Sequence, residues 1–120
     1  MNGPTPTEIK LHQKSRVLEI AFDDGSHFSF SCEFLRVYSP SAEVRGHGPG
    51  QETLQLDKED VNITQIDQVG NYAIQPTFSD GHNTGIFSWE ELHNMGLRQE
   101  AMWQEYLAQL KASGHERKAH

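Results

Sequence analysis

The chain of 120 residues has little cysteine and no long apolar run. Its single cysteine, Cys32, cannot form an internal disulfide and cannot by itself hold zinc or an iron–sulfur cluster. Apolar runs span only a few residues, as at 20–22, whereas a membrane-spanning helix needs about 20. The first residues show no basic segment followed by an apolar one, so no secretory signal is expected. These absences predict a reduced, cytoplasmic setting without membrane association.

Basic charge is also scarce, since 10 Lys and Arg oppose 17 Asp and Glu and give a formal net charge of -7. Non-specific nucleic-acid binding needs a basic surface that releases counterions, so no nucleic-acid partner is expected. Hydrophobic residues make up 35% of the chain, which is enough for one modest core. We therefore expect one domain over residues 8–112, with a flexible leader at 1–7 and a disordered tail at 113–120.

The usual catalytic and nucleotide-binding motifs are missing as well. Residues 46–50 (Gly-His-Gly-Pro-Gly) are glycine-rich but lack the lysine of a phosphate-binding loop. There is no Gly-x-Ser-x-Gly elbow and no His-Glu-x-x-His motif, and no histidine begins a His-x-Asp or His-x-Glu pair. Cys32 has no His or Lys beside it in the sequence to activate its thiol. We therefore expect no enzymatic activity and, apart from the zinc or iron considered below, no cofactor.

What the chain does have is alternation. Residues 16–22 and 26–32 place apolar side chains at every second position, so each range predicts a strand with one buried face. The sequence Asp23-Asp24-Gly25 between them predicts a hairpin turn, because glycine tolerates the positive φ that such turns require. Further strands are expected over residues 61–69, 72–78 and 84–87, and residues 38–52, with three Gly and two Pro, are expected to form mostly loop.

The sequence contains an internal repeat. Residues 22–25 (Phe-Asp-Asp-Gly) match 78–81 (Phe-Ser-Asp-Gly), and residues 30–35 match 87–92. Each unit reads strand, turn, strand, short helix. This pattern predicts an α+β fold: a small, mainly antiparallel sheet built from two hairpin–short-helix units, plus a C-terminal amphipathic helix. The alternative is that two common hairpins resemble each other by chance.

The C-terminal part of the chain has strong helix signals. Ser88 is a good N-cap and Glu91 completes a capping box, whereas Gly96 is expected to end this first helix. A longer helix is expected over 97–112. An apolar stripe on it is either a core face or, if left uncovered, an interface with a protein partner or a second copy, consistent with a monomer or weak homodimer. The stripe comprises Met102, Trp103, Tyr106, Leu107 and Leu110.

The most distinctive motifs lie at residues 34–48 and 78–92. They read Leu-Arg-x-x-Ser-Pro-Ser-Ala-Glu followed by Gly-His, and Asp-Gly-His-x-Thr-Gly-Ile-Phe-Ser-Trp. On these motifs the chain resembles the gamma-butyrobetaine hydroxylase-like N-terminal domain family over about residues 8–96. The resemblance implies a domain of uncharacterised function that occurs alone in bacteria, in carnitine-pathway dioxygenases and in Mrp-type proteins that handle iron–sulfur clusters. It thereby implies an adaptor role with a link to iron–sulfur or metal-enzyme pathways.

The resemblance also implies a site. Dioxygenase members hold a structural zinc with a Cys-x-Cys-x-x-Cys cluster and one histidine, and these positions fall on Ser39, Ser41, Val44 and His82 here. Structural zinc prefers thiolate and imidazole ligands, so the zinc site of the family is expected to be lost in this chain. The alternative is a zinc or iron site of different make-up, with the ligands His82, His47 and one carboxylate, Glu43 or Asp80.

The loop at residues 36–48 carries donors suited to an anionic ligand. Arginine holds a carboxylate or phosphate through two parallel hydrogen bonds, and the amides near glycines 46 and 48 can converge on an anion. We expect this loop and the His82 hairpin to recognise an acidic group or a protein tail. In the structural alternative, Arg36 or Arg45 pairs with Glu33, Glu43 or Glu52 to order the loop. The candidate ligand-binding residues are Arg36, Ser39, Ser41, Arg45 and His47.

Overall fold

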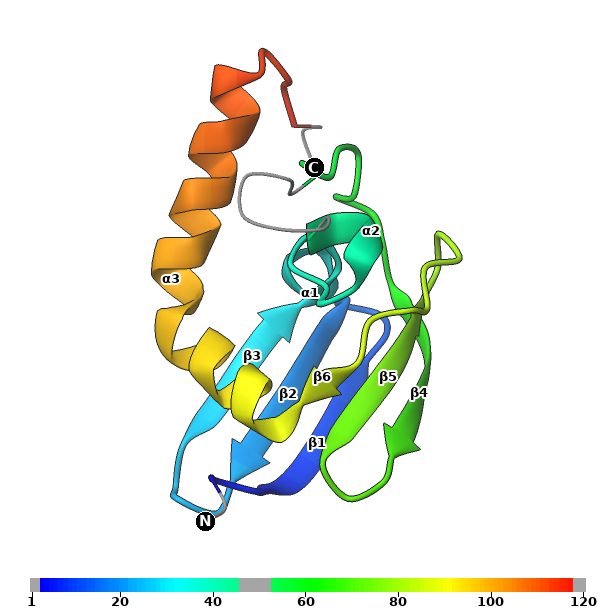
Figure 1. Ribbon diagram of the computed structural model, residues 1–120, viewed down its shortest axis with the longest axis vertical. Helices are drawn as coiled ribbons and strands as arrows, with labels where there is room; N and C mark the ends of the chain where they lie inside the picture. The colour runs from blue at the N-terminus through cyan, green and yellow to red at the C-terminus, as the bar shows by residue number, and fades with distance from the viewer. Residues whose placement is uncertain (1–2, 46–52, 118–120) are drawn as a thin grey trace.

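The computed structural model describes residues 3–45 and 53–117 and shows an α+β fold with two antiparallel three-stranded sheets (Figure 1). The first sheet has the order β1-β2-β3, formed by Pro6–His12, Val17–Phe22 and His27–Ser31. The second has the order β4-β5-β6, formed by Ile63–Val69, Ala73–Phe78 and Phe87–Ser88. The predicted α+β class is confirmed, with each hairpin unit in a sheet of its own.

Three helices accompany the sheets in the described ranges. They are α1 at Cys32–Val37, α2 at Ala42–Arg45 and α3 at Trp89–Ala112. Figure 1 shows α1 and α2 at one end of the sheets and α3 running along their side. The short α2 lies inside the stretch expected to be mostly loop, and β1 begins at Pro6, inside the expected leader. No helix in the described part of the chain is long and apolar enough to cross a membrane.

The two sheets share one core. The alternation seen in the sequence corresponds to inward-facing side chains, since Leu18, Ile20 and Phe30 of the first sheet are fully buried. Side chains of the second sheet and the first turns of α3 complete the same cluster, among them Ile63, Ile74, Phe78, Phe87 and Leu92. Burying a side chain of this size contributes about 1.5–3 kcal/mol, so this cluster dominates the stability of the fold.

The repeat in the sequence has the same local geometry in both units. Gly25 and Gly81 sit in the hairpin turns with φ of 89° and 92°, a region that favours glycine. Ser31 and Ser88 then cap the following helices, and each hydroxyl accepts a backbone N–H at 3.0 Å. Both serines have extended backbone, with φ of -70° and -72°. The same capping signal therefore begins α1 and α3, although α1 has 6 residues and α3 has 24.

The expectation that Gly96 ends a helix is wrong, because α3 runs without interruption from Trp89 to Ala112. Gly96 lies where the helix crosses β3, and the ring of Phe28 packs against its Cα. A Cβ at this position would lie 2.4 Å from that ring. The glycine is therefore required by tertiary packing, which outweighs its unfavourable helix propensity of about 1 kcal/mol.

Gly96→Ala is expected to lower the free energy of unfolding by about 1–3 kcal/mol, because the new methyl group must displace the Phe28 ring. Urea denaturation measures the loss, and Gln104→Ala, on the exposed side of α3, is the matched control. The penalty should shrink in a Phe28→Ala background. An unchanged penalty there would show that the cause is not steric.

The apolar stripe on α3 packs inside the chain. Tyr106 and Leu110 are buried and form a second small cluster with Val37 of α1. Trp103 packs against it and is covered by the guanidinium of Arg117, which lies 5.3 Å from the ring centroid. Met102 and Leu107 are half-buried. Most of the stripe is thus a core face, and residues 113–117, expected as a tail, contribute a contact.

Candidate functional site

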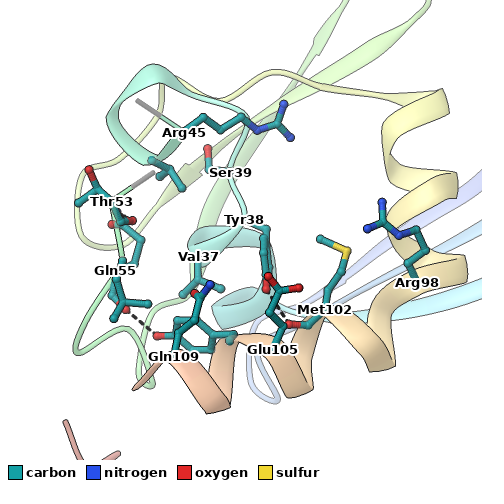
Figure 2. Close-up of a pocket in the computed structure, with 13 residues that line it drawn as sticks. Val37, Tyr38, Ser39, Arg45, Thr53, Gln55, Arg98, Met102, Glu105 and Gln109 are labelled. Atoms are coloured by element: carbon teal, nitrogen blue, oxygen red, sulfur yellow. Dashed lines mark hydrogen bonds between the residues drawn. The ribbon is translucent and has the colours of Figure 1, made fainter. Parts of the chain in front are cut away.

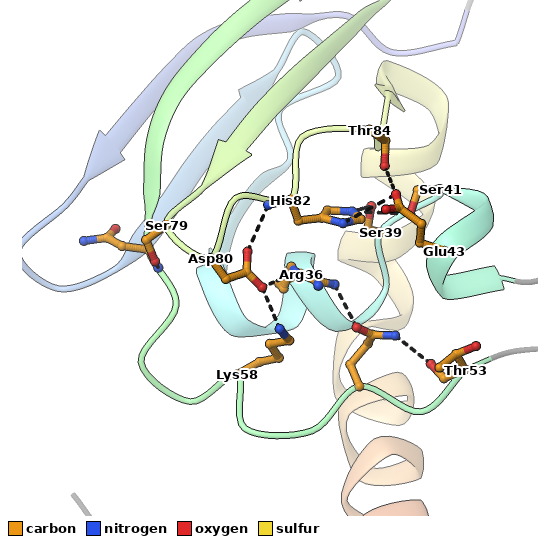
Figure 3. A network of polar contacts seen from close by, with 12 residues as sticks. Arg36, Ser39, Ser41, Glu43, Thr53, Lys58, Ser79, Asp80, His82 and Thr84 are labelled. Atoms are coloured by element: carbon orange, nitrogen blue, oxygen red, sulfur yellow. Dashed lines mark hydrogen bonds and ion pairs between the residues drawn. The ribbon is translucent and has the colours of Figure 1, made fainter.

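Arg36 lies at the centre of a buried polar network (Figure 3). Its side chain is 9% exposed, and its Nε donates a hydrogen bond to Asp80 Oδ2 at 2.9 Å. A second guanidinium nitrogen donates to Gln55 Oε1 at 3.0 Å. Arg36 therefore ties α1 to the turn after β5 and to residues 53–60, and its donors are used inside the protein.

Asp80 accepts several of the hydrogen bonds in this network. Its Oδ2 also accepts a hydrogen bond from Lys58 Nζ at 2.6 Å, and its Oδ1 accepts one from the backbone N–H of His82 at 3.2 Å. Burial alone would raise the pKa of Asp80, but the hydrogen bonds from Lys58, the His82 amide and Arg36 outweigh burial and lower the pKa to about 2. Asp80 is therefore ionised under all ordinary conditions.

Ser39 and Ser41, two of the three positions at which the sequence resemblance implies cysteine, meet His82 in the structure. Ser39 Oγ lies 2.9 Å from His82 Nε2, and Ser41 Oγ lies 3.3 Å from the same nitrogen. Glu43 approaches the other ring nitrogen, Nδ1, at 3.8 Å. Burial and the Arg36 cation lower the pKa of His82, so the imidazole is neutral at pH 7. We refer to Ser39, Ser41 and His82 as the serine–histidine corner.

The corner lacks the ligands of a metal site. No group of three His, Cys, Asp or Glu side chains within residues 3–45 and 53–117 is arranged to hold a metal ion. Asp80, one of the carboxylates considered from the sequence, is engaged by Lys58 and Arg36. His47, the second candidate histidine, lies outside the described residues. The zinc or iron alternative therefore has no support in the described structure.

The corner also has the chemical order of a Ser–His–acid relay, with Ser39, His82 and Glu43 in sequence. A relay needs an accessible nucleophile, and Ser39 is 0% exposed. Gly85 lies directly against it, since a Cβ at that position would be 2.1 Å from Ser39 Oγ. The hydroxyl is buried and hydrogen-bonded to His82, so the corner fixes the chain just before α2.

A groove lies between α2 and α3 (Figure 2). Its volume is about 890 Å³, and Tyr38 and Met102 contribute to its lining. Figure 2 shows Arg45 extending from α2 and Arg98 from α3 at the same end of the groove, with Glu105 further along the helix. The other described lining residues are Val37, Ser39, Val44, Thr53, Leu54, Gln55, Tyr106 and Gln109.

Arg45 and Arg98 lie where the groove meets a second, smaller hollow. A smaller hollow of about 410 Å³ continues along α3 and shares Arg45, Arg98 and Met102 with the groove. Arg45, whose side chain is 52% exposed, pairs with Glu91. Arg98 has no carboxylate partner among the described residues. An exposed cation without a partner is available to a ligand, and the Arg45–Glu91 pair is weak enough to exchange, since exposed pairs contribute about 0–1 kcal/mol.

The tyrosines of the groove are hydrogen-bonded within the protein. Tyr38 donates to the carbonyl of Met102 at 2.6 Å, and Tyr106 donates to the carbonyl of Gln55 at 2.7 Å. Burial raises the pKa of both hydroxyls, that of Tyr106 to about 12. Both side chains are therefore neutral, and neither supplies a base or a nucleophile at pH 7.

The structure separates the candidate ligand-binding residues into two groups. Arg36, Ser39 and Ser41 are buried in the polar network and the corner, whereas Arg45 is exposed at the groove. The structural alternative predicted that these arginines pair with carboxylates of the chain. They do, but the partners are different from the predicted ones: Arg36 pairs with Asp80 and Arg45 with Glu91. Arg98 was not among the predicted residues, because it lies on α3, outside the loop at residues 36–48. Its spacing of four from Met102 on α3 is the signal that would have placed it on the same face.

Comparison with known proteins agrees with the fold. A family model described as gamma-butyrobetaine hydroxylase-like, N-terminal, matches residues 9–93. One protein with an NMR solution structure is 47% identical to this chain, and the two structures superpose with a TM-score of 0.82. The match covers 99% of this chain and 95% of the other. A second protein with an NMR solution structure is 37% identical, with a TM-score of 0.83, and the match covers 98% of this chain and 92% of the other.

A crystal structure from Acidithiobacillus ferrooxidans is also similar. It is described as a protein of unknown function of the DUF971 family, is 40% identical with a TM-score of 0.63, and covers 77% of this chain and 92% of its own. The search of curated proteins gave no match.

Proposed function

Because the chain belongs to the gamma-butyrobetaine hydroxylase-like N-terminal family, we propose that it is a non-catalytic accessory domain that binds an acidic segment of a partner protein. The binding surface is the groove between α2 and α3. One observation carries the proposal: Arg45 and Arg98, which come from different elements, border the same groove and the adjoining hollow. One of the similar solved structures is described as a protein of unknown function.

The chemistry of the groove favours an anionic ligand. Two guanidinium groups at one end can each bind a carboxylate through parallel hydrogen bonds. Glu91 pairs with Arg45, and Glu90 and Glu105 also line the hollow and the groove, so an acidic segment reaches both guanidinium groups by displacing Glu91 from Arg45. Tyr38 and Met102 beside them offer apolar contact to the rest of the ligand.

The buried residues support this surface indirectly. The Arg36–Asp80 pair and the serine–histidine corner anchor the chain on both sides of Tyr38, immediately before α2. The backbone N–H of Thr53 donates to the carbonyl of Val44 at 2.8 Å and fixes the other end of the loop. Arg45 is therefore held in place before the ligand arrives, which lowers the entropic cost of binding.

A titration with tetraglutamate, followed by backbone amide NMR, tests the proposal. We expect saturable shift changes at Arg45, Arg98 and Met102 that weaken with added salt. Arg98→Glu should raise the dissociation constant at least about tenfold, whereas Lys111→Glu, at the far end of α3, is the matched control and should lower affinity far less. Shifts that are absent, that cluster elsewhere, or that respond equally to both variants would refute the groove as the binding surface.

A further inference from the structure

Strand β1 leaves one edge of the first sheet open. It pairs with β2 on one side, and no strand lies on its other side within the described part of the chain. Residues 7–10 are all exposed, and among the residues that the structure describes, the backbone groups of 8–12 make no hydrogen bond outside the pairing with β2. Ile9, a large apolar residue, is 36% exposed in the middle of this edge. An open edge with an exposed β-branched residue is a template for another strand.

The charges on this edge are self-complementary. Glu8 and Lys10 precede and follow Ile9 in the strand and share the face of the sheet opposite to it. Lys10 Nζ lies 3.5 Å from Glu8 Oε2, and more than half of each side chain is exposed. When two copies of β1 run antiparallel about Ile9, Glu8 of the first copy lies opposite Lys10 of the second, and Lys10 of the first lies opposite Glu8 of the second. Opposite charges in facing positions stabilise an antiparallel pair, and like charges destabilise it.

We propose that β1 pairs with β1 of a second copy of this chain, antiparallel and about a two-fold axis at Ile9. The two three-stranded sheets then join into one continuous sheet. The two Ile9 side chains pack on each other at the axis on one face of the joined sheet, and the two Glu8–Lys10 pairs form on the opposite face. The interface is isologous, so the same short segment supplies both halves.

The other long edge of the molecule does not carry the same pattern. Strand β4 is also unpaired on one side within the described residues, and its central residue is Ile66. Pairing two copies of β4 about Ile66 would place Asp67 opposite Gln65, which gives no ion pair. Its only charged residue is Asp67, so β4 lacks the charge complementarity that selects a second copy. The observations therefore favour β1.

Two charge reversals and their mixture test the pairing. Sedimentation equilibrium across a concentration series is expected to show a reversible dimer for the unmodified chain. Glu8→Lys and Lys10→Glu each place like charges opposite one another, and each should weaken the dimer at least about tenfold. In an equimolar mixture, the two lysines of one variant face the two glutamates of the other, which should restore association. Circular dichroism checks that both variants, which alter exposed side chains, remain folded.

Each outcome decides the proposal. An unmodified chain that stays monomeric up to its solubility limit would refute the proposed dimer. A dimer that both variants retain would place the interface elsewhere, and a mixture that fails to associate would exclude the Glu8–Lys10 register. Because β1 contributes no residue to the groove between α2 and α3, these results are independent of the tetraglutamate titration.

Discussion

Replacing Ser39, Ser41 and Val44 by cysteine is expected to give the chain one tightly bound zinc ion. The serine–histidine corner already brings two of these positions to one imidazole nitrogen, at 2.9 and 3.3 Å. Ligands around a tetrahedral zinc are about 3.5 Å apart, so thiolates at these positions need only small adjustments. Val44 follows within one turn, since its N–H donates to the carbonyl of Ser41 at 3.1 Å. Two of the three positions thus already meet the imidazole, and the third lies within one helical turn of Ser41.

We expect a dissociation constant below about 1 µM, or about -8 kcal/mol. Elemental analysis should find about one zinc per chain, and Co²⁺ should give the absorption of a tetrahedral thiolate site. The matched control is the same variant with His82→Ala, which removes the imidazole and should lower affinity at least about tenfold. A triple variant that folds without binding zinc would show that the corner does not preserve the geometry of a metal site.

Asp80→Ala is expected to lower the free energy of unfolding by about 3 kcal/mol. The substitution leaves Arg36, which is buried, without its counter-charge, and breaking a buried pair from one side costs about 3–5 kcal/mol. Part of that cost is relieved because the Asp80 side chain is 25% exposed and water can enter. Lys58→Ala, which removes the other cation, should cost about 1 kcal/mol or less, because the remaining Arg36–Asp80 pair stays intact.

The pH dependence gives a second readout. The pKa of Asp80 is lowered to about 2 in the folded protein, below the value of about 3.9 for an unfolded chain. The stabilisation is therefore fully present above about pH 4 and is lost as the pH falls toward 2. Urea midpoints measured across this range should show a smaller acid loss in Asp80→Ala than in the unmodified chain. Equal slopes would indicate that Asp80 does not carry the acid sensitivity.

A double variant separates charge from packing. In Asp80→Ala the penalty arises from an orphaned guanidinium, so adding Arg36→Met should recover part of the lost stability. Methionine keeps the apolar volume of the arginine stem without its charge. If the double variant is less stable than Asp80→Ala alone, the hydrogen bond from Arg36 to Gln55 matters more than the ion pair.

Local patterns predicted the local structure well. The alternation in residues 16–32 gave the buried faces of β2 and β3, because a strand with one face in the core has a period of two. The Ser88–Glu91 capping box predicted the start of α3, and the repeat predicted the matching turns at Gly25 and Gly81. All of these signals act over a few residues, so they can be read without knowledge of the fold.

Contacts between residues far apart in the sequence could not be predicted from local patterns. The end of a helix at Gly96 was a sound local inference, but the Phe28 ring that requires the glycine is 68 positions away in the sequence. Likewise, Arg36 and Ser39 looked like surface donors because their partners, Asp80 and His82, belong to the second unit. No spacing within a single segment distinguishes a donor that meets a ligand from one that meets a distant part of its own chain.

The position of α3 has a consequence for how the chain acquires its fold on the ribosome. This helix follows both sheets in the sequence, and its first turns close the shared core through Leu92 and Met95. Until α3 has been synthesised, the apolar cluster of the two sheets lacks these side chains. Nascent chains that end before residue 89 should therefore be clients of chaperones that recognise exposed apolar surface, and full-length chains should escape them.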